Sequence, residues 1–459
     1  MRFFGKANKV VSKFPPGPKG LPVLGNLLSM RNAERFFRET AREYPVGMFS
    51  LYLLQQALVV FEPKFVYQVL TEADNYHRPQ YAMQVLESLL GKGILTTDGP
   101  EWRRQRNILQ PRFEKRHIDG MIPEMHAEIV GLFNRWEKNV NGPAFDMRLD
   151  MPRLTLGVLG RTMLGTQELS EEASAVAQAL GFALVKAFEY FHRPPFWASL
   201  PLPGNFAYKR AIGCVDETVS RLTSQRREFL KKYPNAATDA RNLLTALIGA
   251  TSAESGANTI TDRELRDHVV TMLLAGHETT STSLMWLVYI LAKYPNVAEE
   301  LAAEILALPN RLLTTNDFRS LRYTKAVVSE ALRLYPPLPL IARESVAMAE
   351  LGGYSIPPKT LVIMPLVLIH THPEYWESPE KFKPERWQTG DKPKSGAYLP
   401  FVLGQHRCIG EHFALLEITL FLAEFFRRGW RVRPTAEDVQ PTKSSIRRPS
   451  GLTLQLVKP

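Results

Sequence analysis

The sequence predicts a mainly α-helical protein with a smaller β part. Helical periodicity of apolar residues covers most of the first 325 residues, and an unusually long helical pattern follows Thr261, whereas strand-like alternation is limited to short segments. The 459 residues contain no internal repeat or break in composition. We therefore expect one domain at residues 21–459, behind a basic, proline-rich segment at residues 1–20.

The individual elements can be placed along the chain. Strand patterns predict a hairpin at residues 48–62 around Gln55 and Gln56. Helical periodicity predicts helices at residues 34–44, 63–72, 100–109, 123–141, 170–187, 209–232, 239–250, 324–334 and 410–427. Further strands are expected at residues 339–344, 354–356, 360–365 and 451–459.

The longest predicted helix runs from about Asp262 to Tyr294. Thr261 supplies its N-cap, and Pro295 marks its end. At 1.5 Å per residue it would be roughly 45–50 Å long, and its middle is apolar on nearly all faces. Such a helix should cross the core of the protein.

The composition, with 45% hydrophobic and 22% charged residues, is that of a soluble globular protein. The formal net charge is +11, but the basic residues are scattered. Zinc-finger spacing and RNA-binding signatures are absent from the sequence, so we expect no nucleic-acid partner. An acidic protein partner remains open.

Two cysteines, Cys214 and Cys408, are too few for a disulfide framework or a four-cysteine iron–sulfur cluster. This number suits a reducing compartment, and we expect a cytoplasmic location. The N-terminal segment lacks the continuous apolar run of a signal peptide or a spanning helix. At most, it would make weak peripheral contact with a membrane.

The stretch FVLGQHRCIGEHF at residues 401–413 places Cys408 directly before a predicted helix. Gly404 and Gly410 permit tight turns on either side, and a helix N-terminus stabilises a thiolate. This pattern is compatible with a zinc ligand, with a nucleophile activated by His412, or with an inert buried cysteine. The loop by itself does not decide among these readings.

The sequence AGHETT at residues 275–280 lies in the middle of the longest predicted helix. A carboxylate and a hydroxyl are costly in a buried helix unless they have partners, so they indicate use. Thr279 can donate a hydrogen bond to the carbonyl of Ala275, which would bend the helix and open a polar notch. Taken alone, the motif also fits a helix-bending threonine beside a satisfied Glu278.

Three weaker signals complete the set. Glu330 and Arg333 lie three residues apart on one helix face, and alone they would be an ordinary surface ion pair. Arg386 lies in the sequence PERW, within an irregular segment. Trp102 and Arg106 are four residues apart, which places an aromatic ring and a cation side by side on one helix.

Together, and in this order, WxxxR, AGHETT, ExxR, PERW and FxxGxHxCxG resemble the cytochrome P450 family of haem-thiolate monooxygenases over essentially the whole chain. The resemblance implies the cytochrome P450 fold, with the long central helix over the haem. The commonest family pattern has arginine two residues before the cysteine, whereas His406 here is similar to many soluble bacterial members. A histidine contact would be pH-sensitive.

By this resemblance, Cys408 is the axial ligand of the iron of haem b, and Phe401 belongs to the same cofactor-binding loop. The residues that match haem-propionate contacts are Trp102, Arg106, Arg343 and His406. Glu278 and Thr279 match the acid–alcohol pair that delivers protons at the oxygen site, which favours monooxygenation over lyase or isomerase chemistry. The residues that match the family's structural, non-catalytic triad are Glu330, Arg333 and Arg386.

The resemblance further implies O2 as co-substrate and a lipophilic small molecule that is oxidised at a C–H or C=C bond. Only residues 409–459 follow the cysteine, without a GxGxxG motif or further cysteines. A separate ferredoxin or flavodoxin with an NAD(P)H-dependent reductase is therefore expected as the electron donor. The protein itself is expected to be a monomer. The basic residues predicted to face the electron donor are Arg103, Arg104, Arg112, Lys115 and Arg116.

The substrate pocket is expected to be lined by residues 81–95, 181–206, 271–279, 338–342 and 445–452. The aromatic residues of the second segment favour a large apolar ligand; they are Phe182, Phe188, Tyr190, Phe191, Phe196 and Trp197. The alternative from another enzyme class is a cysteine hydrolase that uses Cys408 and His412.

Overall fold

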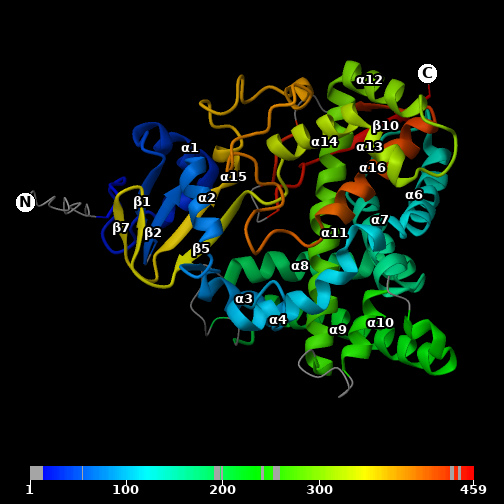
Figure 1. Ribbon diagram of the computed structural model, residues 1–459, viewed down its shortest axis with the longest axis horizontal. Helices are drawn as coiled ribbons and strands as arrows, with labels where there is room; N and C mark the ends of the chain where they lie inside the picture. Colours follow the sequence, from blue (N-terminus) through cyan, green and yellow to red (C-terminus); the bar gives the residue numbers. More distant parts are fainter. Residues whose placement is uncertain are drawn as a thin grey trace, which may run out of the picture. The chain divides into compact units, whose positions relative to one another are not determined.

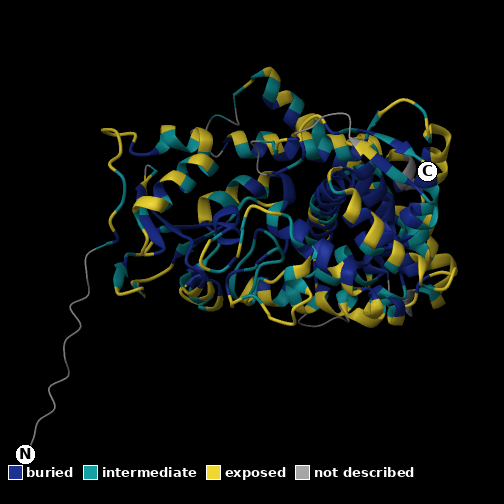
Figure 2. Cartoon of the chain, turned by 90° about the horizontal axis from the view of Figure 1, so that it is seen from above, coloured by how far each residue is buried: buried dark blue, intermediate teal, exposed yellow. Residues whose placement is uncertain are grey.

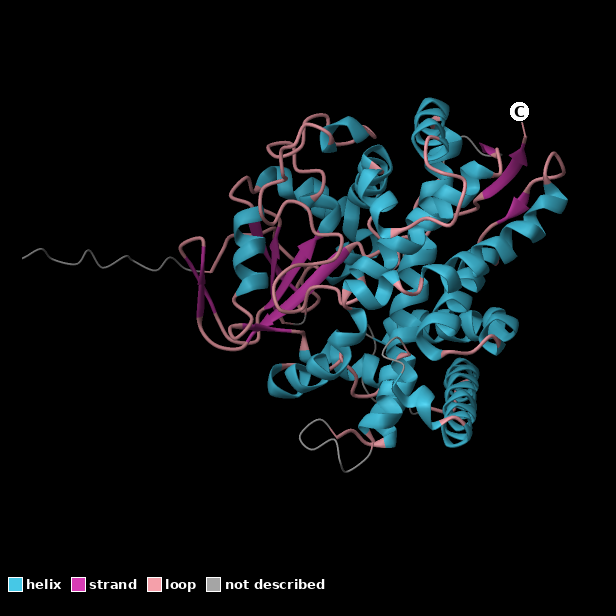
Figure 3. Ribbon diagram, turned by 45° about the vertical axis from the view of Figure 1, so that its right-hand side comes forward, coloured by secondary structure: helices cyan, strands magenta, loops and turns pink. Residues whose placement is uncertain are grey.

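The computed structural model describes residues 14–53, 55–190, 197, 200–238, 242–251, 259–434, 439–442 and 446–458. It confirms a mainly helical protein with small sheets, as the cyan helices of Figure 3 show. Residues 1–13 of the predicted N-terminal segment lie outside the described residues. No helix in the described part of the chain is long and apolar enough to cross a membrane.

The chain forms two compact units. The first comprises the described residues up to Gln80 together with Pro339–Glu380 and Pro393–Arg407. The second comprises Tyr81–Leu338, Lys381–Lys392 and Cys408–Pro459, as far as these are described. Both units are built from segments that alternate along the sequence, and a single domain from residue 21 onward stays a prediction.

The first unit is built around a sheet in the order β1-β2-β8-β5-β3. The predicted hairpin at residues 48–62 is the antiparallel pair β1 and β2, and β2 continues parallel to β8. The strands are β1 (Met48–Tyr52), β2 (Gln56–Val60), β3 (Tyr76–His77), β5 (Leu340–Ser345) and β8 (Leu361–Pro365), with β6 (Ala349–Leu351) and β7 (Tyr354–Ile356) as a separate pair. The helices are α1 (Ala33–Glu43), α2 (Pro63–Thr71) and α15 (Leu366–Ile369).

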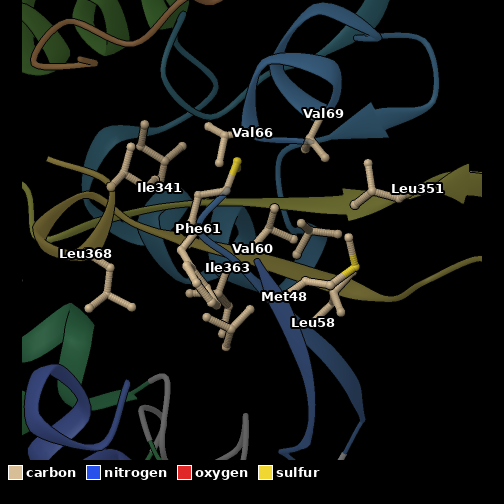
Figure 4. Packing of buried hydrophobic residues seen from close by; sticks show 14 of the residues in the cluster. Met48, Leu58, Val60, Phe61, Val66, Val69, Ile341, Leu351, Ile363 and Leu368 are labelled. Carbon is tan, nitrogen blue, oxygen red and sulfur yellow. The ribbon is translucent and has the colours of Figure 1, made fainter. Parts of the chain in front are cut away.

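One apolar cluster holds the first unit together (Figure 4). Val60 and Ile363 from neighbouring strands lie in it with Val66 and Val69 of α2. Four consecutive residues are buried in both β2 and β8, as in strands that are covered on both faces, and Val66 and Val69 share one face of α2 through their spacing of three residues.

The second unit is mostly helical. Its helices include α3 (Gln80–Leu90), α4 (Gly99–Leu109), α5 (Lys115–Asp119), α6 (Ile122–Trp136), α7 (Asp150–Leu159), α8 (Glu168–Tyr190), α9 (Pro203–Lys232), α10 (Leu243–Ala250), α11 (Asp262–Lys293), α12 (Pro295–Leu306), α13 (Thr315–Ser320), α14 (Arg322–Leu334) and α16 (Glu411–Arg427). A small sheet has the order β4 (Phe145–Asp146), β10 (Thr453–Val457), β9 (Arg431–Pro434). The helices α3, α7 and α12 were not expected from the sequence. Pro295 ends α11 as predicted, but it also occupies the first turn of α12, where a proline is well tolerated.

The central helix α11 is confirmed at 32 residues. It begins with a capping box in which Thr261 and Glu264 satisfy each other's backbone N–H groups. It contacts α7, α9, α14 and α16, among which it is labelled in Figure 1. Residues 280–292 are all buried, a class drawn in dark blue in Figure 2. The prediction of a helix that crosses the core therefore holds within the second unit.

Candidate functional site

Cys408 lies in the second unit just before α16, whose N-cap is Gly410. The cysteine is exposed. Burial lowers the pKa of Arg106 on α4, while the negative charge of Cys408 raises it, so the two groups interact. A helix N-terminus and a guanidinium both favour the thiolate, which is the form that binds metals. The thiol therefore fits an iron ligand. Gly410 has an ordinary φ of −90°, so the backbone does not require glycine there.

Arg106 lies over the indole ring of Trp102, 5.9 Å from its centroid and one turn away on α4. Trp102 is buried, and Nε of Arg106 also donates to the side chain of Gln110 at 2.8 Å. These two contacts hold the guanidinium in one direction. The second unit thus presents a fixed cation close to Cys408, which suits a carboxylate such as a haem propionate.

The loop before Cys408 belongs to the first unit. Val402 and Leu403 pack against the apolar cluster of that unit, which explains why the loop carries large residues there. Gly404 has a φ of +76°, and a Cβ at this position would lie 2.1 Å from the carbonyl oxygen of Leu70. Glycine is therefore required at residue 404 by both conformation and space.

The other predicted cofactor contacts also lie in the first unit. Arg343 is on β5, only 5% exposed, and donates to the carbonyl of Ala342 at 2.8 Å. His406 Nε2 lies 3.4 Å from the side-chain nitrogen of Gln405. Phe401 is half-buried. The contacts of Arg343, His406 and Phe401 with a haem stay predictions.

Glu330 and Arg333 of α14 form a completely buried ion pair, with neither side chain exposed. Nε and Nη2 of Arg333 donate to the two carboxylate oxygens at 2.8 and 2.7 Å. The same carboxylate accepts from Arg386 Nε, the Trp387 indole and the Lys383 backbone. Burial raises the pKa of Glu330, but these donors together lower it by more, so the net shift of the pKa is downward. The surface ion pair that the spacing alone suggested is wrong, because the structure brings Arg386 to the same buried carboxylate.

The middle of α11 is less buried on one side where the AGHETT sequence lies. Thr279 Oγ1 donates to the carbonyl of Ala275 at 2.8 Å, as the sequence predicts. Ala275 is exposed, and Gly276 and Thr279 are half-buried, although most of the surrounding helix is buried. At Gly276, an added Cβ would lie 2.9 Å from the Leu159 side chain of α7, so the two helices approach closely here. This less buried side of α11 at Ala275, Gly276 and Thr279, called the notch below, carries the Thr279 hydroxyl.

Glu278, one residue before this threonine, is 5% exposed and contacts two side chains, Arg448 and His277. Arg448 donates to its Oε2 in a short ion pair, and His277 Nε2 lies 3.4 Å from its Oε1. Burial raises the pKa of Glu278, but its contact with His277 and the charge of Arg448 outweigh this and lower the pKa to about 2. Gly181 of α8 leaves room for the pair, because an added Cβ would lie 3.3 Å from Oε1. The carboxylate is thus ionised and fixed at neutral pH.

Sequence reasoning missed Arg448 and the His277 side chain as partners of Glu278. Arg448 lies in the segment 445–452 that was expected to line the pocket. Its positive charge was the one feature of the sequence that indicated an acidic partner such as Glu278. His277 is adjacent in the motif, and its role became visible only through its two ring contacts.

His412 does not turn toward Cys408. Its Nε2 instead contacts Asp119 at the end of α5, at 2.9 Å. The hydrolase alternative needed this histidine as the base for the cysteine. The geometry therefore does not favour that alternative.

The predicted basic patch is altered by ion pairs. Arg104 pairs with Glu101 at 2.7 Å and also with Glu264, so its charge is committed within the second unit. Arg116 contacts Glu114 at 3.1 Å. The docking role of the five predicted residues stays a prediction, and Arg104 is the one whose side chain forms two ion pairs.

The predicted aromatic lining is also partly reassigned. Tyr190 is buried, donates to Asn205 at 2.7 Å and packs edge-to-face on Tyr208, so it holds α8 to α9. Phe182 on α8 is 43% exposed. Two residues of the set, Phe191 and Phe196, lie outside the described residues.

Comparison with known proteins agrees with this geometry. The family model described as cytochrome P450 matches residues 15–455. Cyclooctatin synthase of Streptomyces melanosporofaciens is 31% identical over 91% of this chain and 89% of its own length. Cyclooctat-9-en-7-ol 5-monooxygenase of the same organism is 30% identical over 95% of this chain and 94% of its own.

A third relative, pentalenene oxygenase of Streptomyces avermitilis, is 27% identical and covers 96% of both chains. Among solved structures, the cytochrome P450DA heme domain matches with a TM-score of 0.85 and 26% identity over 98% of both chains. The chain therefore belongs to the cytochrome P450 family of haem-thiolate monooxygenases and binds haem b.

Proposed function

We propose that this monooxygenase inserts one oxygen atom from O2 into a C–H or C=C bond of a lipophilic small molecule, with electrons from a separate redox protein. The observation that carries this proposal is the notch in α11, where the Thr279 hydroxyl stands beside an ionised, buried Glu278. Both groups can hold and pass protons.

In this proposal, Cys408 would bind the haem iron through its thiolate, and Phe401 lies in the same loop. The haem supplies the oxidising chemistry when it is bound. The propionates are held by Trp102, Arg106, Arg343 and His406. The triad of Glu330, Arg333 and Arg386 supports the chain before the cysteine loop.

The proton-handling residues differ in what fixes them. Thr279 is directed by its bond to the Ala275 carbonyl, so its oxygen can still accept a hydrogen bond from water or from the substrate side. Glu278 is fixed by Arg448 and stays ionised, so it acts as an acceptor that must be protonated before it can donate. We infer that Glu278 passes protons through water to the Thr279 hydroxyl.

The relatives favour a cyclic, mostly hydrocarbon substrate. Two of them are named for cyclooctat-9-en-7-ol and for pentalenene, whose chemical names denote an unsaturated alcohol and an alkene. The exposed Phe182 on α8 and the apolar middle of α11 suit such a molecule.

The electrons are proposed to come from a separate acidic ferredoxin or flavodoxin with its NAD(P)H-dependent reductase. The cations proposed to steer it are Arg103, Arg112 and Lys115, near the helix that carries Arg106. A net charge of +11 supports an acidic partner.

The cofactor assignment is tested with the reduced protein under carbon monoxide. We expect the far-red-shifted Soret band of thiolate-ligated haem, and Cys408→Ala should abolish it. Cys214→Ala is the matched control, because Cys214 lies on α9 and should leave the band intact. Retention of the band in Cys408→Ala would show that another residue ligates the iron.

The proton role is tested with Thr279→Ala, with Ser283→Ala as control. Ser283 bonds back to the Thr279 carbonyl one turn further along α11, at 3.0 Å, but carries no proposed proton role. We expect Thr279→Ala to divert NAD(P)H consumption from product to peroxide, whereas Ser283→Ala stays coupled. Equal coupling in both variants would contradict the proton role.

A further inference from the structure

In His277, the histidine of the AGHETT sequence, a hydrogen bond fixes the protonation of one ring nitrogen, Nδ1. His277 is completely buried, and its Nδ1 lies 2.7 Å from the backbone carbonyl oxygen of Leu273. A carbonyl oxygen can only accept a hydrogen bond, so Nδ1 must carry the hydrogen. The tautomer is therefore fixed, and the remaining question is whether Nε2 also carries a proton.

Nε2 faces the carboxylate of Glu278, with 3.4 Å between Nε2 and Oε1. Within the described residues, Nε2 has no other hydrogen-bond partner. With both groups deprotonated at these atoms, a lone pair of the ring would point at a negative oxygen in a buried site. One proton shared between Nε2 and Oε1 removes this conflict, since either atom can then donate to the other.

The surroundings decide where this proton rests. Arg448 contacts the other carboxylate oxygen, so it favours ionised Glu278 and leaves the proton on His277. Among the described residues, the neighbours from other elements that contact this pair are neutral: α8 presents Gly181 to Oε1, and Thr155 of α7 donates to the backbone carbonyl of His277 at 3.2 Å. The titratable and charged groups in contact within the described residues are His277, Glu278 and Arg448.

The burial of these side chains sets the direction of proton exchange. The His277 side chain is 0% exposed, that of Glu278 is 6% exposed, and that of Arg448 is 34% exposed. Because Nδ1 is fixed on Leu273 and Nε2 faces Glu278 as its one partner among the described residues, the second proton of His277 enters and leaves through that carboxylate. Arg448 has the most exposed side chain of the three, so we expect exchange with solvent on its side.

We propose that His277 and Glu278 hold one proton between them and that His277 is the store that reloads Glu278. This inference rests on the proposed proton role of Glu278 and Thr279. The proton moves from Nε2 to Oε1, which leaves a neutral imidazole and a neutral carboxylic acid. Glu278 then gives the proton to water in the notch, and bulk water returns one proton to the pair through Glu278.

Nuclear magnetic resonance of the holoenzyme tests the store without measuring turnover. The reduced carbon monoxide complex is prepared with 15N-labelled histidine, and the His277 signals are those lost in His277→Gln. We expect both ring nitrogens of His277 to carry hydrogen at pH 7. An Nε2 without hydrogen at pH 7 would overturn the proposal.

Kinetics of His277→Gln supply the second test. A glutamine side chain can still donate toward Glu278 but cannot take up an additional proton. We expect the coupled rate to fall about tenfold, less than the roughly 10²–10⁴-fold contribution of a direct proton donor. The solvent isotope effect on that rate should also rise. Thr155→Val is the matched control, because it removes the hydroxyl that contacts the backbone carbonyls of His277, Met151 and Pro152 but leaves both ring contacts of His277 in place, so it should leave the rate and the His277 signals unchanged.

The two proposals fail separately. If Thr279→Ala stays coupled while His277 carries both hydrogens, the proton role at the notch is wrong and the shared proton stands. If Thr279→Ala uncouples the enzyme while His277→Gln keeps the rate and isotope effect of the wild type, the store is wrong and the role of the notch stands.

Discussion

Glu417 of α16 should destabilise the folded protein by an amount that grows with pH. Its side chain is fully buried, and neither carboxylate oxygen has a hydrogen-bond partner among the described residues. Burial raises its pKa well above the ordinary value, so the folded state keeps it neutral while the unfolded chain ionises. Folding above the unfolded pKa must therefore take up a proton.

The size of this destabilisation follows from the pKa of about 4.3 in the unfolded chain and from a free-energy change of about 1.36 kcal/mol for each pH unit above it. If the carboxyl stays neutral when folded, this term opposes folding by about 1 kcal/mol at pH 5 and about 4 kcal/mol at pH 7. Glu417→Gln keeps the shape without the ionisation, so it should be more stable than the wild type by a margin that widens over this range.

The matched control is Glu424→Gln on the same helix. Glu424 contacts His126 at 3.3 Å and Arg428 at 3.1 Å; burial raises its pKa, but these contacts outweigh burial and lower it. Its stabilisation is present above the unfolded pKa and is lost as pH falls through the folded pKa, so this variant should be less stable at pH 7. Guanidinium unfolding of the three proteins from pH 5 to pH 8 measures both effects. A pH-independent difference between Glu417→Gln and wild type would refute the reasoning.

Three further predictions concern other buried or strained positions. Glu330→Gln leaves a fully buried arginine without its counter-charge and should lower the unfolding free energy by about 3–5 kcal/mol. The control is Glu189→Gln in the partly exposed i,i+3 pair with Lys186, which should change the unfolding free energy by less than about 1 kcal/mol in the same denaturant series. Gly404→Ala combines a positive φ, about 1–2 kcal/mol, with an overlap of about 1–3 kcal/mol; Gly353→Ala, with φ +84° and open space, should show only the first loss, and equal losses would count against the overlap. Arg448→Met removes the cation beside Glu278 and should raise the pKa of Glu278 above its value of about 2. The stability that the wild type loses between about pH 4.3 and pH 2 should then be lost at higher pH, which circular dichroism during acid unfolding measures. An unchanged acid transition would argue against the ion pair.

The sequence by itself determined the features that depend on neighbouring residues. The capped start of α11, the bond from Thr279 to Ala275 and the place of Cys408 before α16 all follow from the helix repeat and from local capping rules. The hairpin of β1 and β2 was also predicted, because its strands are adjacent in sequence. The helices α7 and α12 were missed because their prolines resembled breaks.

Only the tertiary structure decided which charges are buried and with what they pair. Glu330 and Arg333 have the same spacing as a surface pair, and Arg448 meets Glu278 across 170 positions of the sequence. Spacing along a helix fixes which residues share a face, but not what covers that face. Because a charge is stable in the interior only with its partners in place, the roles of these residues depend on packing between elements that are distant in the chain.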